Sequence, residues 1–114
     1  MPSEKTEIAD GTLLVRTEMK NGDTEVIALC GELDLANAGT AEAALQGSLA
    51  AGRSVIVDMR ELEFIDSTGI AMLVASLNGE NGDSRISFIP STAPAVSRVL
   101  ELTGLEERMP LADA

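Results

Sequence analysis

The residues best suited to chemistry lie in the segment Asp66-Ser67-Thr68-Gly69. Asp, Ser and Thr favour the cap of a helix over its interior, and apolar residues follow at helical spacing: Ile70, Leu73, Val74 and Leu77. A helix that begins at Ser67 is therefore predicted. The hydroxyl of Ser67 has two interpretations. Either Ser67 or Asp66 only caps the helix, which contributes about 1 kcal/mol, or the hydroxyl is a phosphorylation site.

The phosphorylation hypothesis has a physical basis in the geometry of a helix start. The first turn offers unpaired backbone N–H groups and the positive end of the helix dipole, which together accommodate a phosphate. A phosphate carries a charge of about −1.5 to −2 at neutral pH. Because Glu63 and Asp66 already make this region acidic, we expect the phosphate to act mainly on whatever docks there.

The composition excludes several familiar sites. The chain has 114 residues with no His, Trp or Tyr and one Cys, so it cannot form a Ser-His-Asp or Cys-His nucleophile, a His-ligated metal site or an intramolecular disulfide. Cys30 lies in a strand-like apolar run, which favours a buried, reduced thiol over a reactive one. We therefore expect a reducing compartment.

Charge and hydropathy narrow the choice of partners. The net charge is −11 and only 2% of the residues are aromatic, which argues against nucleic acid as a partner. The first residues lack a signal-peptide pattern and no apolar run is long enough to cross a membrane. We expect a cytoplasmic protein that binds another protein and not a membrane, although a high acid content also serves solubility alone.

The remaining patterns predict the elements that position Ser67. Residues 1–11 are expected to form a loose tail, and residues 12–114 a single domain. Alternation from Leu13 to Met19 and the segment 25–33 predict a hairpin around Asn21-Gly22. The run Val55-Ile56-Val57 predicts a central strand buried on both faces. Shorter strands are expected around Ile86–Phe88 and Met109–Leu111.

Two further helices complete the expected fold. One runs from an N-cap at Asn37 to Ala51, and the other begins near Pro94 and is closed by Gly104. Strands followed by alternating helices and strands indicate an α/β fold with a mixed β-sheet of four to five strands and three to four α-helices, mainly covering one face. If Ile70 and Leu73 face that sheet, Met72 lies either on an outer docking face or in a gap of the core.

Four segments, taken in order, resemble the STAS-domain anti-sigma-factor antagonists of bacteria. The most specific is Leu62-Glu63-Phe64-Ile65-Asp66-Ser67-Thr68-Gly69, which is similar to the family's phosphorylation signature with Ser67 as the acceptor. The other three are Gly31-Glu32-Leu33-Asp34, Ala95-Val96-Ser97-Arg98-Val99-Leu100 and Leu102-Thr103-Gly104-Leu105. The resemblance implies a STAS fold over most of the chain.

The resemblance also implies a function. Such a protein, when unphosphorylated, binds an anti-sigma factor with serine kinase activity and so releases a sigma factor. Phosphorylation at Ser67 ends the binding, and a PP2C-type phosphatase restores it. ATP and magnesium then belong to the kinase, so the chain itself is expected to be no enzyme and to need no cofactor or metal.

The partner-binding surface that follows from this resemblance comprises Asp34, Asp66, Ser67, Thr68, Gly69 and Met72, with Thr68 as a secondary phosphate acceptor. Asp34 either lines this surface or caps the helix that follows it. One departure from the family is Ile70-Ala71 where members often have Leu-Gly, which strengthens the helix start but slightly narrows the approach of a partner's backbone.

Two other functions remain open at this point. The chain is alternatively a STAS scaffold subunit of a stress-signalling assembly or of a lipid-transport system, which need not use Ser67 as a switch. The third hypothesis is a small enzyme that uses Asp34, Asp58 and Asp66 as general acid and base. The sequence shows no glycine-rich phosphate loop that would support it.

Overall fold

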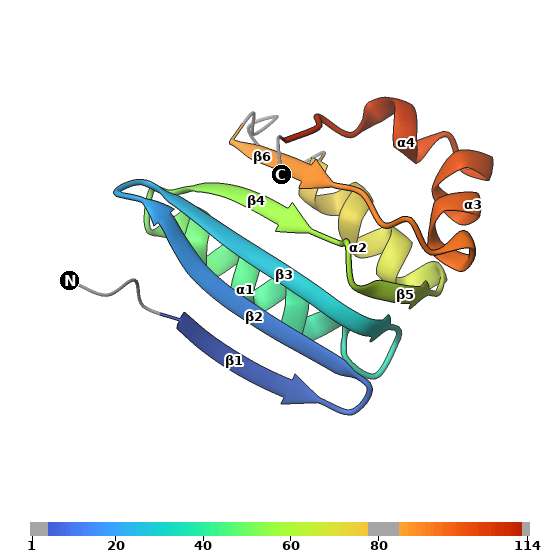
Figure 1. Ribbon diagram of the computed structural model, residues 1–114, viewed down its shortest axis with the longest axis horizontal. Coiled ribbons are helices and arrows are strands. Elements are labelled where there is room, and N and C mark those ends of the chain that lie inside the picture. The colour runs from blue at the N-terminus through green and yellow to red at the C-terminus, as the bar shows by residue number, and fades with distance from the viewer. Residues whose placement is uncertain (1–4, 78–84, 113–114) are drawn as a thin grey trace.

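The computed structural model describes residues 5–77 and 85–112. Its strands and helices follow in the order β1 (Lys5–Asp10), β2 (Leu13–Asn21), β3 (Thr24–Leu33), α1 (Ala38–Ala50), β4 (Ser54–Asp58), β5 (Leu62–Ile65), α2 (Ser67–Leu77), β6 (Ile86–Ile89), α3 (Pro94–Leu102) and α4 (Leu105–Arg108). Figure 1 shows one sheet with helices packed against it. The α/β class and the mixed sheet expected from the sequence are confirmed.

The sheet has the strand order β1-β2-β3-β4-β6, and β5 pairs with β3 beyond the end of β4. Strands β1, β2 and β3 are antiparallel, whereas β4 and β5 run parallel to β3 and β6 runs parallel to β4. The parallel pairs are joined through helices, as chain connectivity requires. Six strands are thus described, where four to five were expected, because β1 and β5 were not foreseen.

Strand β1 corrects the expectation of a loose tail. Residues 1–4 lie outside the described part of the chain, but Lys5–Asp10 pair with β2 over their whole length. Almost every side chain of β1 is exposed. The strand therefore has no buried face, and its sequence shows no alternation of apolar and polar residues. Backbone pairing holds the strand in place, together with exposed ion pairs of Lys5 with Glu18 and of Glu7 with Arg16.

The hairpin and the central strand form as the sequence predicts. Leu13 and Val15 of β2 face the same core as Ile27 and Leu29 of β3, and all four are at most 1% exposed. In β4, three consecutive residues are buried, as expected. Val55 and Val57 lie in the main core, whereas Ile56 lines a depression on the other face of the sheet. Helices α1 and α2 lie side by side on one face of the sheet (Figure 1), so this face carries the main core.

The described C-terminal part contains α3, as predicted, but lacks a full last strand. Gly104 has φ 73° and closes α3 in the left-handed conformation that was predicted for it. The expected last strand is reduced to a single parallel bridge between Phe88 and Leu111. No helix among the described residues is long and apolar enough to cross a membrane.

Candidate functional site around Ser67

Asp66, not Ser67, caps helix α2. Its Oδ1 accepts a hydrogen bond from the backbone N–H of Gly69 at 3.0 Å, three residues further along, which is the geometry of an N-cap carboxylate. Its backbone N–H in turn donates to the carbonyl of Leu33 at the end of β3. The cap interpretation and the phosphorylation hypothesis therefore apply to different residues, and the Ser67 hydroxyl is not needed to start the helix.

Ser67 occupies the first position of α2 and is exposed. Within the described residues, its hydroxyl takes part in no hydrogen bond, and the backbone N–H groups of Ser67 and Thr68 find no acceptor. These N–H groups are the unpaired donors expected in a first helical turn. A phosphate on Ser67 would thus reach open solvent and free donors without displacing an existing contact. Thr68 is half-buried and less accessible.

Gly69 allows α2 to approach the sheet closely. A Cβ at this position would lie 2.7 Å from Cγ1 of Ile65 and 3.0 Å from Cγ of Leu33, both of which are buried. The glycine in the Asp-Ser-Thr-Gly segment is therefore explained by packing at the helix start. Gly69 is buried and has no side chain to offer a partner, so it contributes to the expected binding surface only by positioning the helix.

Asp34 lies in the turn between β3 and α1 and is half-buried. Its Oδ1 accepts from the backbone N–H of Ala36 at 3.0 Å, so its carboxylate stabilises the turn and does not cap α1. Asn37 precedes α1 as predicted, yet its side chain makes no cap hydrogen bond. Asn37 is 1% exposed and instead bridges the Asp34 N–H and the Glu32 carbonyl at 2.9 Å each. The turn is thereby held rigidly.

The glycine at position 31, the first residue of the Gly-Glu-Leu-Asp segment, is also required for a steric reason. Its φ is +97°, and a Cβ there would collide with the backbone oxygen of Thr12. Glycine is the residue that adopts this conformation without strain. The register of β3 shifts at this point as it turns from β4 to pair with β5, which brings Glu32 beside Phe64.

Of the two positions expected for Met72, an outer docking face or a gap of the core, the structure shows the core position. Met72 is 5% exposed and belongs to the core cluster, as does Leu73, while Ile70, Val74 and Leu77 are only half-buried. The close contact at Gly69 sets the rotation of α2 so that Met72 and Ser76 turn inward. Met72 lies at the bottom of a shallow groove of about 310 Å³ between α1 and α2, which is also lined by Thr68, Ala71 and Ala75.

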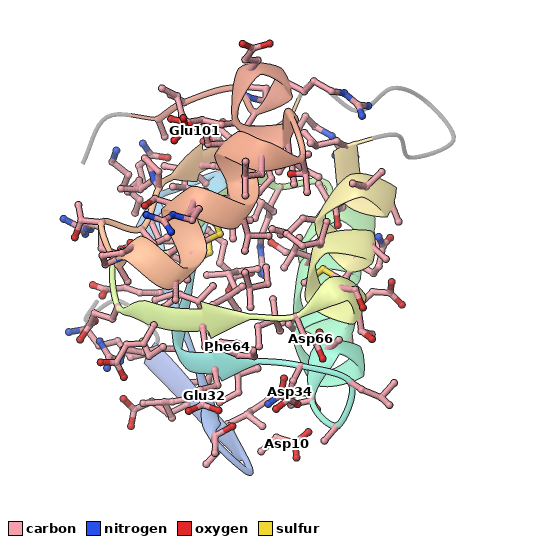
Figure 2. The ribbon with its side chains drawn as sticks, turned by 90° about the vertical axis from the view of Figure 1, so that its right-hand side faces the viewer. Asp10, Glu32, Asp34, Phe64, Asp66 and Glu101 are labelled. Atoms are coloured by element: carbon pink, nitrogen blue, oxygen red, sulfur yellow. The ribbon has the colours of Figure 1, made fainter. Side chains whose placement is uncertain are left out.

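Acidic side chains gather at the end of the molecule that carries Ser67. Figure 2 shows Asp10, Glu32 and Asp34 at this end, with Phe64 and Asp66 level with each other just above them and Glu101 toward the opposite end. Asp34 and Asp66 lie together because the Asp66 Oδ2 accepts from Leu35 N–H at 3.1 Å. Among the described residues, no group of three His, Cys, Asp or Glu side chains is placed to hold a metal ion.

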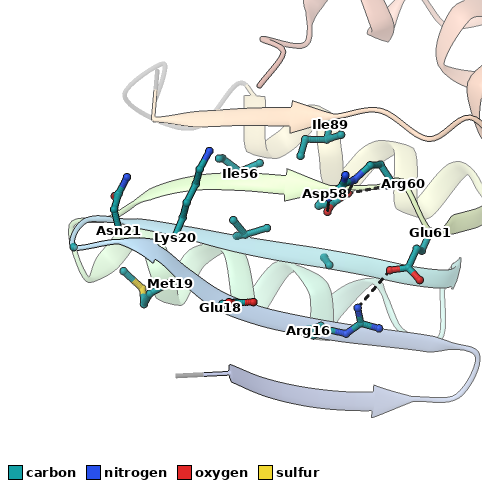
Figure 3. A pocket seen from close by; sticks show the side chains of 13 residues that line it. Arg16, Glu18, Met19, Lys20, Asn21, Ile56, Asp58, Arg60, Glu61 and Ile89 are labelled. Carbon is teal, nitrogen blue, oxygen red and sulfur yellow. Dashed lines mark hydrogen bonds and ion pairs between the residues drawn. The ribbon is translucent and has the colours of Figure 1, made fainter. Parts of the chain in front are cut away.

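A larger depression lies elsewhere, on the face of the sheet that α1 and α2 leave open. It has a volume of about 810 Å³ and is shown in Figure 3. Four of its charged residues are paired with one another: Arg16 with Glu61 at 3.4 Å and Arg60 with Asp58 at 2.8 Å. Burial alone would raise the pKa of Asp58, but hydrogen bonds from Arg60 and its positive charge outweigh burial and lower it.

The acid–base hypothesis is not supported by this geometry. Asp58 faces the open side of the sheet and is paired with Arg60, whereas Asp34 and Asp66 hold backbone N–H groups at the Ser67 end. The three carboxylates do not converge on one site. Cys30 is half-buried, with its Sγ 3.8 Å from Glu61 Oε2, and burial raises the pKa of its thiol, consistent with an unreactive cysteine.

Two exposed apolar residues at the Ser67 end were missed by the sequence reasoning. Leu35 is 76% exposed in the turn before α1, and Phe64 is 43% exposed on β5. The signal for Leu35 was its position between Asp34 and Ala36, outside any apolar periodicity. Phe64 was noted only as part of a motif, and its exposure depends on β5, a strand the sequence did not reveal.

The fold and the exposed serine at the start of α2 define a class of small α/β proteins, and comparison with known proteins shows which family of this class the chain belongs to. The sequence model described as "Mlab, STAS domain" matches residues 17–112. Over 80 residues the chain is 29% identical to the anti-sigma-B factor antagonist of Staphylococcus aureus, a match that spans 69% of this chain and 74% of that protein.

Two solved structures share the fold at 24% identity and a TM-score of 0.71 each. One is an anti-sigma factor antagonist from Mycobacterium paratuberculosis, where the match covers all of this chain and 90% of the other. The other is the anti-sigma factor antagonist SpoIIAA in its unphosphorylated form, with 87% and 88% covered. The chain belongs to the STAS domain family, which confirms the resemblance recognised in its four segments.

Proposed function

We propose that this protein is an anti-sigma factor antagonist that is switched by phosphorylation at Ser67. In the unphosphorylated form it binds an anti-sigma factor with serine kinase activity, and the bound sigma factor is released. The observation that carries the proposal is the position of Ser67: its hydroxyl is exposed at the first residue of α2 while Asp66 supplies the cap. The names of the relatives in S. aureus and M. paratuberculosis support the same role.

The geometry favours a switch that acts on docking and leaves the fold intact. A phosphate on Ser67 needs no change in the cap or the core, because neither uses the hydroxyl. In a contact made for a neutral hydroxyl, however, a dianion would have to be desolvated, which is costly unless it is fully paired. Release of the anti-sigma factor follows from that cost, and a PP2C-type phosphatase would restore binding.

Phosphorylation by anti-sigma kinases of the source organism tests the proposal. The purified protein is incubated with each kinase, ATP and magnesium, and the modified residue is located by mass spectrometry. We expect phosphate on Ser67, no modification of Ser67→Ala, and only minor modification of the half-buried Thr68. In parallel, adding the unphosphorylated protein should dissociate the kinase from its sigma factor. If no kinase binds or modifies the chain, the proposal is wrong.

The match to the Mlab type of STAS domain supports a second candidate, a scaffold subunit of a stress-signalling assembly or of a lipid-transport system. In that case the protein would co-purify with a large homomeric assembly or with a transport ATPase. Its binding would be indifferent to the charge at Ser67. Affinity purification of the wild type and of Ser67→Asp from the source organism separates the two candidates.

A further inference from the structure

Leu35 is an exposed apolar side chain held by a rigid frame. The turn that carries it is fixed at three points: Leu35 N–H donates to Asp66 Oδ2, Ala36 N–H donates to Asp34 Oδ1, and the Asn37 side chain spans the turn from within. Its side chain is nevertheless 76% exposed. A partner that covers Leu35 would bury a leucine without first having to order the loop, which preserves affinity that ordering would otherwise consume.

Phe64 provides a second apolar side chain on the same end of the molecule. It is 43% exposed, and its strand β5 pairs with β3 so that Phe64 lies beside Glu32. The residues that follow in the chain, Ile65 and Asp66, lead directly to Ser67. Because Leu33 pairs with Ile65 and the Leu35 N–H donates to Asp66, both apolar residues lie within two residues of contacts made at the start of α2.

The surroundings of these two residues are acidic, and their charges are not neutralised within the described chain. Asp10, Glu32, Asp34, Glu63 and Asp66 take no part in any ion pair between described residues. The cations of those pairs lie elsewhere, on β1, on the open face and next to α1. An acidic partner surface would therefore be repelled here, and a basic one attracted.

We propose that Leu35 and Phe64 are the apolar anchors of the docking surface around Ser67, and that the partner protein receives them in an apolar pocket whose outer border, away from the Ser67 hydroxyl, carries lysine or arginine side chains. This inference rests on the proposed function and specifies the chemistry of its partner. Apolar anchors surrounded by a charged rim are the usual arrangement of an interface, in which the anchors set the dissociation rate and the rim sets the association rate.

Titration calorimetry with the anti-sigma kinases of the source organism tests the anchors. Leu35→Ala and Phe64→Ala should each weaken the complex about tenfold or more, as buried anchors do. Leu102→Ala is the matched control, because Leu102 is 78% exposed on α3 next to Glu101, which lies toward the opposite end of the molecule from Asp66 (Figure 2), and it should bind like the wild type. Circular dichroism of each variant verifies that the fold is retained.

The charged rim is tested by making the same charge reversal at two positions, one inside the proposed docking surface and one outside it. Glu32→Lys and Glu101→Lys alter the net charge equally, but Glu101 lies at the opposite end of the molecule (Figure 2). We expect Glu32→Lys to slow association severalfold and to reduce its salt dependence, with little effect of Glu101→Lys. Kinase binding that is unaffected by Leu35→Ala, Phe64→Ala and Glu32→Lys would overturn this inference and leave the proposed function standing. Failure of the wild type to bind any kinase would overturn both.

Discussion

Asp66 and Leu35 are joined by a hydrogen bond of 3.1 Å from the Leu35 backbone N–H to Asp66 Oδ2. The same carboxylate caps α2 through the N–H of Gly69, so one side chain fixes both the helix that begins with Ser67 and the turn that presents Leu35. The two parts of the proposed docking surface are thereby positioned relative to each other by Asp66.

Replacing Asp66 should therefore affect stability and the turn together. Asp66→Ala removes the acceptor and should lower the free energy of unfolding by about 1–2 kcal/mol, the range of a lost N-cap, and accelerate hydrogen exchange at the Leu35 amide. Urea denaturation and exchange measured by NMR determine both quantities. Asp66→Asn keeps one acceptor oxygen, so it should retain one of the two hydrogen bonds and have a stability between that of the alanine variant and the wild type. Equal stability of the Ala and Asn variants would show that the carboxylate does not hold these elements.

The contact at Gly69 predicts an unusual response to alanine. In a helix, Gly→Ala normally stabilises by up to about 1 kcal/mol, but the new Cβ at position 69 would press on Ile65 and Leu33, which are buried and cannot move away. Gly69→Ala should destabilise the protein by about 1–3 kcal/mol, as overpacking does. Gly47→Ala in α1, where a Cβ meets nothing within 4 Å, should stabilise it. Thermal unfolding of both variants is the measurement, and an increased melting temperature of Gly69→Ala would contradict the packing described.

The Asp58–Arg60 pair should contribute to the loss of stability in acid. Because the pKa of Asp58 is lowered in the folded state, its contribution is present above the unfolded value of about 3.9 and disappears as the pH falls through the lower folded pKa. The pair is partly exposed, so the contribution stays below about 1 kcal/mol. Urea denaturation between pH 7 and about pH 2 should show a smaller advantage of the wild type over Asp58→Asn at low pH. An advantage that does not change with pH would refute the pairing.

Cys30 should react slowly and only at elevated pH. Burial raises the pKa of its thiol, and the charge of Glu61 adds to this effect, while the charge of Arg16 opposes it. The rate of alkylation by iodoacetamide should rise with a midpoint above the ordinary thiol value of about 8.5. Arg16→Gln should move this midpoint upward and Glu61→Gln should move it downward. Rapid alkylation at neutral pH would contradict the account of Cys30 as an unreactive thiol.

The parts of the fold that bury apolar residues in a regular pattern could be predicted from the sequence. The structure confirms the elements that local patterns predicted. These patterns are the alternation in β2, the apolar run of β4, the cap of α2 and the glycine that closes α3. Strand β1 could not be predicted in this way, because it is held by backbone pairing and leaves its side chains exposed. Strand β5 could not be predicted either, because its four residues do not alternate between buried and exposed positions.

The start of α2 was predicted correctly along the chain, but the hydrogen bonds and packing around it were not. The start of α2 at Ser67 follows from capping preferences, whereas the division of roles between Asp66 and Ser67 depends on a turn 31 residues away that supplies Leu35 N–H. Helix α2 is apolar on most of its surface, so periodicity did not fix its rotation and left Met72 open between an outer face and the core. The contact of Gly69 with Leu33 and Ile65, which sets this rotation, is a tertiary feature.

The central claim is that the phosphate on Ser67 prevents docking without altering the structure beneath it. The most direct measurement is the affinity of the anti-sigma kinase for the protein carrying phosphoserine at position 67, compared with the unmodified protein by calorimetry. We expect the affinity to fall at least a hundredfold, about 2.7 kcal/mol, while the unfolding free energy changes little. Equal affinities of the two forms, with full occupancy of phosphate on Ser67, would contradict the account.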